Sequence, residues 1–134
     1  MLTTTCIHPQ ILAALALCGH GDQILIADGN FPLETHCPNA ELVYLGYCAG
    51  SPRVDDVLEA LCGVANFEKA EVMSPGEGPE PEVFGRFRQI LELDSMDGMD
   101  RYAFYEACNS KVKLAISTGE KRIFSNILLT MGTC

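Results

Sequence analysis

The chain has 134 residues, of which 48% are hydrophobic and 20% are charged, and its net charge is −9. This composition predicts one folded domain, residues 1–134, rather than a disordered chain. The acidic balance argues against nucleic acid and anionic membrane surfaces as partners, and no apolar run is long enough to cross a membrane. Because no export signal is recognised, we expect a cytoplasmic protein.

The first third of the chain predicts one helix and two short strands. Residues 9–18 have helical character, with a proline in the first turn and a glycine just past the end. The apolar run 23–27 predicts a buried strand. The segment 28–40 is rich in Gly, Asn and Pro and predicts a loop, and residues 41–45 predict a second strand.

The middle of the chain predicts two amphipathic helices around one strand. A Ser-Pro start signal and apolar residues at helical spacing predict a helix over 54–61. Residues 69–73 predict a strand, 74–81 a loop, and 83–91 a second helix.

The last third predicts a helix followed by two strands. Asp100 can cap a helix that ends near Cys108. Residues 112–117 and 126–130 predict strands, and the charged segment 118–122 between them fits a hairpin turn better than a phosphate-binding loop.

Helices and short apolar strands therefore alternate along the chain. This pattern favours an α/β sandwich with a mixed, largely parallel sheet flanked by helices. Ligands in such folds gather in the loops at the carboxyl ends of strands. Three polar clusters occupy predicted loops: Gly19–Asp22, Asp28–Pro32 and Thr118–Asn126.

The candidate polar residues each allow two interpretations. His20 lies between two glycines where a helix should end, and a helix C-terminus favours a protonated imidazole; the alternative is an exposed histidine in a helix-stop turn. Asp28 follows a strand directly and can meet a ligand there, or it can form an Asx turn. Arg101 in the first turn of a helix can face a ligand, whereas Tyr102 and Tyr105 on one helix face are explained by core packing.

Metal and disulfide chemistry are not expected. The seven cysteines are irregularly spaced and include no Cys-x-x-Cys pair, so the sequence predicts reduced thiols in a reducing compartment. His8, His20 and His36 do not form a metal-binding spacing. His8 is predicted to cap the first helix, and His36 has no evident acidic partner.

Taken in order, these motifs resemble the ribose pyranase and fucose mutarotase (RbsD/FucU) family of bacterial sugar catabolism. The resemblance covers nearly the whole chain and is carried by Gly19-His20-Gly21-Asp22, Asp28-Gly29-Asn30-Phe31-Pro32, Arg101-Tyr102-Ala103-Phe104-Tyr105-Glu106, Thr118-Gly119-Glu120 and Asn126-Ile127-Leu128-Leu129. It implies a compact α/β subunit in a pentamer or a decamer, active sites at subunit interfaces, and no cofactor.

The resemblance also implies roles for individual residues. The proton-donating histidine of the family matches His20, and its sugar-binding aspartate matches Asp28. The late sugar-binding segment falls on Phe124, Ser125 and Asn126, where Phe124 replaces the tyrosine of the family. Arg101 precedes an aromatic-x-Phe-Tyr-Glu segment, as in the fucose-type branch.

The implied activity is anomer interconversion of a free neutral monosaccharide, with L-fucose the expected sugar. General acid–base groups open and reclose the hemiacetal ring, with His20 transferring the proton while Asp28, Arg101 and Asn126 hold hydroxyls. A D-ribose pyranase and a non-catalytic sugar-binding subunit are the alternatives, the latter because Phe124 lacks the phenol hydroxyl. A structural oligomer without a ligand is a further alternative.

Overall fold

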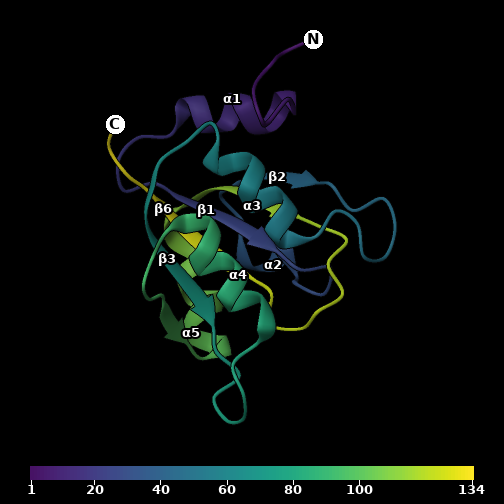
Figure 1. Ribbon diagram of the computed structural model, residues 1–134, viewed down its shortest axis with the longest axis vertical. Coiled ribbons are helices and arrows are strands. Elements are labelled where there is room, and N and C mark those ends of the chain that lie inside the picture. Colours follow the sequence, from purple (N-terminus) through teal and green to yellow (C-terminus); the bar gives the residue numbers. More distant parts are fainter.

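The computed structural model describes residues 1–134 and is built around one six-stranded sheet (Figure 1). The strands lie in the order β2-β5-β1-β6-β3-β4. Only β6 runs against its neighbours, because β1–β5, β2–β5 and β3–β4 pair in parallel while β1–β6 and β3–β6 pair antiparallel. The bounds are β1 (Gln23–Ala27), β2 (Glu41–Tyr44), β3 (Phe67–Met73), β4 (Asp97–Met99), β5 (Val112–Ser117) and β6 (Ile127–Met131).

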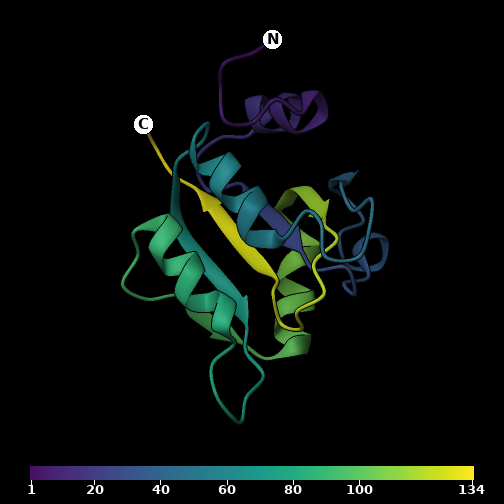
Figure 2. The same cartoon turned by 45° about the vertical axis from the view of Figure 1, so that its right-hand side comes forward.

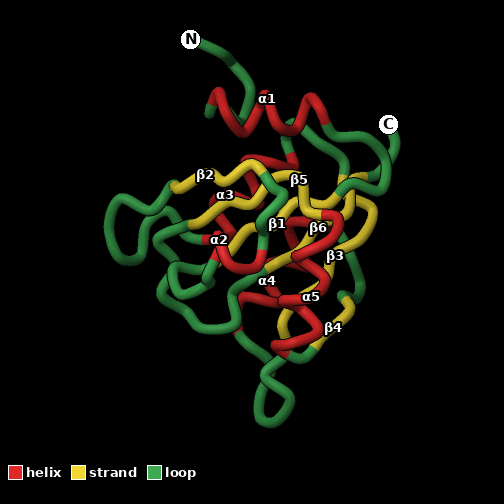
Figure 3. The backbone as a smooth tube through the Cα atoms, turned by 180° about the vertical axis from the view of Figure 1, so that it is seen from behind, coloured by secondary structure: helices red, strands yellow, loops and turns green.

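Helices cover both faces of this sheet, as the views from the front and from behind show (Figures 1 and 3). They are α1 (Pro9–Leu17), α2 (Leu33–His36), α3 (Val54–Cys62), α4 (Glu82–Leu91) and α5 (Arg101–Lys111). The mixed, largely parallel sheet flanked by helices is therefore confirmed. None of these helices has the length and apolar character needed to cross a membrane.

The central strand β1 explains why the two faces need separate helices. Ile24 and Ile26 belong to the apolar cluster under α1, α3 and α4, whereas Leu25 and Ala27 belong to the cluster that also contains residues of α2 and α5. A strand covered on both faces reads as an uninterrupted apolar run. In Figure 2, α3 and α4 lie on one side of the central strands and α5 lies on the other.

Most predicted elements are present with shifted ends. The predicted helices at 9–18, 54–61 and 83–91 correspond to α1, α3 and α4. Asp100 caps α5, because its carboxylate accepts hydrogen bonds from the N–H groups of Tyr102 and Ala103, both at 3.0 Å. The side chain of His8 accepts from the N–H of Ile11, so its predicted capping role is confirmed.

Two short elements were not expected. The predicted loop 28–40 contains α2, a single helical turn of four residues. The three-residue strand β4 pairs with β3 at its exposed edge. Neither segment is long enough to show an apolar repeat, so periodicity could not reveal them.

The hairpin interpretation of residues 118–122 is wrong. The strands on either side of this segment, β5 and β6, do not pair with each other, because β1 lies between them in the sheet. The connection 118–126 instead crosses the carboxyl end of β1. It is held there because Thr118 Oγ1 donates to the carbonyl of Ala27 at 2.8 Å and the N–H of Gly29 donates to the carbonyl of Glu120 at 2.9 Å.

The core-packing explanation is wrong for Tyr102 and holds only in part for Tyr105. Tyr102 is 80% exposed, and the fully buried aromatic residue of this helix is Phe104. Tyr105 is only partly buried, at the edge of the apolar cluster. One residue of displacement around a helix moves a side chain by about 100°, so the i,i+3 spacing alone did not identify the buried face.

Candidate functional site

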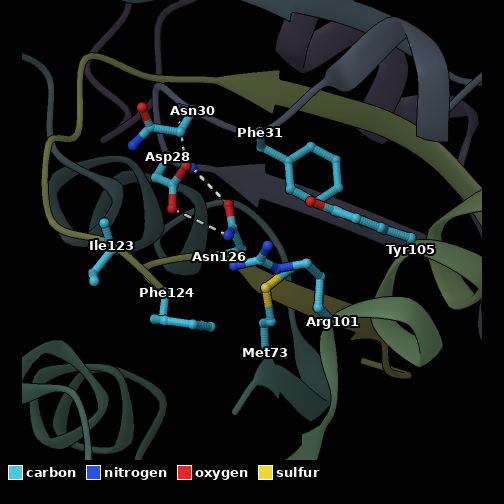
Figure 4. A pocket seen from close by; sticks show the side chains of 9 residues that line it. All are labelled: Asp28, Asn30, Phe31, Met73, Arg101, Tyr105, Ile123, Phe124 and Asn126. Atoms are coloured by element: carbon cyan, nitrogen blue, oxygen red, sulfur yellow. Dashed lines mark hydrogen bonds between the residues drawn. The ribbon is translucent and has the colours of Figure 1, made fainter. Parts of the chain in front are cut away.

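A cavity of about 290 Å³ opens at the edge of the sheet where β1, β3 and β4 end and β6 begins. Four elements therefore bring their terminal residues to one place, at the carboxyl ends of parallel strands where α/β folds bind ligands. The volume lies near the lower limit for small-molecule sites and suits a small ligand. The lining residues are Asp28, Asn30, Phe31, Met73, Arg101, Tyr105, Ile123, Phe124 and Asn126 (Figure 4).

Asp28 and Asn126 form the polar floor of this pocket and fix each other's orientation. The N–H of Asp28 donates to Asn126 Oδ1 at 2.8 Å, and Asn126 Nδ2 donates back to Asp28 Oδ2 at 3.1 Å. The N–H of Asn30 donates to Asp28 Oδ1 at 3.0 Å, which is the predicted Asx turn. Both side chains are buried, so the carboxylate and the amide are rigid before any ligand arrives.

Burial changes the acidity of this carboxyl group. It raises the pKa of Asp28 above the ordinary value of an aspartate, and the hydrogen bonds from Asn30, Ser125 and Asn126 only partly offset this rise. The nearby Glu120 raises it further. A carboxylate with a raised pKa is a stronger proton acceptor than an exposed one, which suits a group that contacts ionising hydroxyls.

Phe124 and Arg101 form the opposite wall. The backbone of Phe124 has φ of 59°, in the left-handed region that bulky residues rarely adopt. Its ring lies 5.9 Å from the Arg101 guanidinium carbon, within the range of a cation–π contact. Such strained backbone concentrates at functional sites, where the surrounding structure holds it in place.

A buried ionic cluster supports the loop that carries Phe124. The Glu120 carboxylate accepts from Arg122 through three N–H groups at 2.7–3.0 Å and from the N–H of Val54 at 3.3 Å. Arg122 also donates to the buried Asp55 at 2.7 Å. Although burial acts to raise it, the Arg122 contacts lower the pKa of Glu120 to about 2. The loop is thereby fastened to the first turn of α3, a role that its charged sequence did not reveal.

His20 lies outside this pocket. It occupies the turn between α1 and β1, where its side chain is 59% exposed and Nε2 lies 2.9 Å from Glu68 Oε1. Asp22 makes no hydrogen bond or ion pair with it, and its carboxylate instead accepts from the N–H of Gly19 at 2.9 Å. The five residues of β1, which span roughly 15 Å, separate this turn from Asp28. The pocket of a single chain therefore does not contain its own His20.

The structure thus brings together four of the six residues proposed from the sequence. Asp28, Arg101, Phe124 and Asn126 line the cavity. Ser125 does not: its side chain is fully buried and its hydroxyl makes no hydrogen bond.

Five further lining residues were not proposed as site residues. Asn30 and Phe31 follow Asp28 in the same motif, and Tyr105 lies one helical turn after Arg101, so their positions carried a signal. Met73 and Ile123 are apolar residues without any motif, and only the tertiary structure places them at the cavity.

Fold and site together define an α/β protein with a small polar pocket that is floored by a carboxylate–amide pair and walled by aromatic rings. Over residues 1–134 the chain matches the RbsD / FucU transport protein family. The protein belongs to the RbsD/FucU family.

Solved structures agree with this assignment. The fucose mutarotase of Streptococcus pneumoniae, determined in complex with L-fucose, has a TM-score of 0.85 and 25% sequence identity, with 100% of this chain and 99% of that chain covered. FucU of Bifidobacterium longum has a TM-score of 0.82 and 30% identity, with 96% of each chain covered. RbsD of Bacillus subtilis, determined with D-ribose, shares the fold with a TM-score of 0.87 at 21% identity over 100% of this chain and 99% of that chain.

Proposed function

We propose that this protein is a mutarotase that interconverts the α and β anomers of a free neutral monosaccharide, with L-fucose as the expected substrate. The observation that carries the proposal is the preoriented Asp28–Asn126 pair at the floor of a small pocket. A carboxylate accepts hydrogen bonds and an amide both donates and accepts them, which matches the hydroxyls of a sugar. Family membership and the likeness to a mutarotase that binds L-fucose support this choice.

The walls of the pocket fit the remaining surface of a sugar. Arg101 offers a planar fork of donors that can hold two neighbouring oxygens. Phe31, Phe124 and Met73 provide apolar surface for the C–H groups of the ring. We expect sugar binding to use these residues together, without a metal or cofactor.

The chemistry needs two proton movements. A base removes the proton of the anomeric hydroxyl while an acid protonates the ring oxygen, so the bond between C1 and the ring oxygen breaks and an open-chain aldehyde forms. Rotation about C1–C2 and the reverse proton transfers give the other anomer. Positioned acid–base groups accelerate such steps by about 10²–10⁴ each.

We assign one of these transfers to His20 of a neighbouring copy. The His20 of the same chain lies at the far end of β1 from Asp28, so it cannot reach a sugar in its own pocket. A second copy that docks its α1–β1 turn over the cavity would complete the site. The proposal therefore includes a homo-oligomer, a pentamer or a decamer, with shared active sites.

A non-catalytic sugar-binding subunit is the second candidate. Phe124 favours it, because a phenylalanine can stack on a sugar ring but cannot exchange a proton with it.

Exchange spectroscopy separates the two candidates. Catalytic amounts of the protein should accelerate exchange between the anomeric proton signals of L-fucose. His8→Ala, which alters only the cap of α1, is the control and should accelerate this exchange as much as the unmodified protein does. Binding without acceleration would support the non-catalytic subunit and overturn the mutarotase proposal.

A further inference from the structure

Tyr105 carries the only side-chain hydroxyl among the residues that line the pocket. Figure 4 shows this side chain extending from α5 past Phe31, with its phenol oxygen on the side that holds Asp28 and Asn126. A phenol both donates and accepts a hydrogen bond. Its usefulness to a ligand depends on how firmly the ring is held.

The ring of Tyr105 is held between two other aromatic rings. His36 stacks on it with ring centroids 3.8 Å apart and an interplanar angle of 6°. Phe31 meets the same ring edge-on, with centroids 5.5 Å apart at 73°, and also contacts His36 at 6.0 Å and 68°. Aromatic contacts of this kind stabilise a ring orientation beyond the apolar area that they bury.

The short helix α2 gives His36 a fixed place over this ring. Leu33 and Cys37, one helical turn apart, are buried in the same apolar cluster as Phe104 and Cys108 of α5. These contacts fasten α2 to α5. His36 precedes Cys37 in the chain and Tyr105 follows Phe104, so the two rings are brought together by the packing of their neighbours. His36 is only partly buried. Its backbone N–H donates to the carbonyl of Pro32 at 3.2 Å, whereas its imidazole makes no hydrogen bond and is placed by the stack on Tyr105.

We propose that His36 is a positioning residue that holds the Tyr105 phenol in the sugar pocket. His36 does not line the cavity and acts through the stacked ring. The expected effect on catalysis rests on the proposed function, but the contact between the two rings is a property of the free protein. The two can therefore be tested separately.

The first test reads the ring contact without any sugar. In the NMR spectrum, the ring protons of Tyr105, assigned with Tyr105→Phe, should be shielded by the stacked imidazole. His36→Ala should remove this shielding, and His36→Phe should keep a flat ring and retain it. His8→Ala is the matched control, because His8 lies at the start of α1 and should leave these signals unchanged.

The second test measures anomer exchange in a double-mutant cycle. His36→Ala should lower kcat/KM about tenfold, as expected when one positioned hydrogen bond is lost, and His36→Phe should recover most of it. In the Tyr105→Phe background, His36→Ala should have no further effect, because the hydroxyl that it positions is already absent. A thermal melt of each variant reports any loss of packing between α2 and α5.

Each outcome decides the proposal. Unchanged Tyr105 signals in His36→Ala, an equal loss of kcat/KM in both backgrounds, or no rescue by His36→Phe would overturn it. If the unmodified protein accelerates no anomer exchange, the proposed function fails. The positioning role of His36 is then decided by the ring shielding and by titration of the Tyr105 signals with L-fucose.

Discussion

Phe124 is the residue at which the pocket departs most from the sequence pattern that it resembles. Its strained backbone places an apolar ring against Arg101, where a tyrosine would present a hydroxyl. Phenylalanine and tyrosine share backbone preferences, so Phe124→Tyr adds one oxygen without altering the strain.

The added oxygen should help one reaction more than the other. Conversion between pyranose and furanose needs a second hydroxyl to attack C1 and therefore more proton transfer than anomer inversion. We expect Phe124→Tyr to raise pyranose–furanose exchange of D-ribose more than anomer exchange of L-fucose, both measured by exchange NMR. Strong ribose pyranase activity in the unmodified protein, unimproved by the substitution, would instead place the pyranase function first.

The Arg101 side chain is predicted to contribute to sugar binding rather than to stability. It forms no ion pair within the chain, and its contact with Phe124 is a modest one. Arg101→Ala should therefore raise KM for L-fucose about tenfold, with a smaller effect on kcat, because a lost hydrogen bond to a charged group costs about 1.5–3 kcal/mol. The midpoint of thermal unfolding should change little; a large drop without a change in KM would assign Arg101 to stability.

The connection 118–126 carries Phe124 and Asn126, so its conformation determines the shape of the pocket. Glu120 holds it to α3 through Arg122 and the N–H of Val54. Since the pKa of Glu120 falls to about 2 in the folded protein, below the ordinary value of about 4.5 for a glutamate, its contribution to stability is present above about pH 4.5. That contribution is lost as the pH falls through 2.

The expected result is a pH-dependent difference between Glu120→Gln and the unmodified protein. At pH 7 the variant should lose on the order of 3 kcal/mol, because one member of a buried ionic cluster is neutralised. The difference should narrow as the pH falls from 4.5 towards 2, as measured by urea unfolding. Glu80→Gln, which changes an exposed partner of Arg88, is the control and should show a much smaller effect; a gap for Glu120→Gln that stays constant with pH would contradict the ionic explanation.

Elements with a clear apolar repeat could be predicted from the sequence, whereas contacts between distant segments could not. The run 23–27 identified β1, and apolar residues at helical spacing identified α3 and α4. The pairing of β6 with β1 and β3 is non-local, so the local sequence at residues 118–122 wrongly predicts a hairpin.

The same distinction applies to the site. Asp28, Arg101 and Asn126 were predicted because they follow recognisable motifs, and the structure gathers them around one cavity. His20 and Asp28 are close in sequence, but an extended strand separates them in space. The stack of His36 on Tyr105 joins segments about seventy residues apart, and no local pattern indicates it.

At the scale of the whole molecule, the separation of His20 from the pocket predicts an assembly. Light scattering should return a pentamer or a decamer at micromolar concentration. A stable monomer that still accelerates anomer exchange would remove the need for a second copy and contradict the shared site.

Mixed assemblies test the shared site more directly. His20→Ala should fold normally, because its exposed pair with Glu68 contributes little, and should slow exchange by about 10²–10⁴. Asp28→Asn should also be inactive. Co-expression of the two variants should restore part of the activity, since some pockets then combine an intact Asp28 with the intact His20 of a neighbour. If the co-expressed variants stay inactive, His20 and Asp28 of different copies do not combine in one site, and the shared-site proposal is wrong.

The position of β1 has a consequence for how such an assembly tolerates change. In the proposed ring, this one strand connects the proton-transferring turn of one catalytic centre to the carboxylate floor of the next. An inserted residue would reverse the facing of the side chains beyond it and lengthen the spacing between adjacent centres. Every subunit that carried the insertion would therefore impair two centres, and variation should be far less tolerated in these five residues than in the exposed 74–81 loop at the opposite end from α1 (Figure 1).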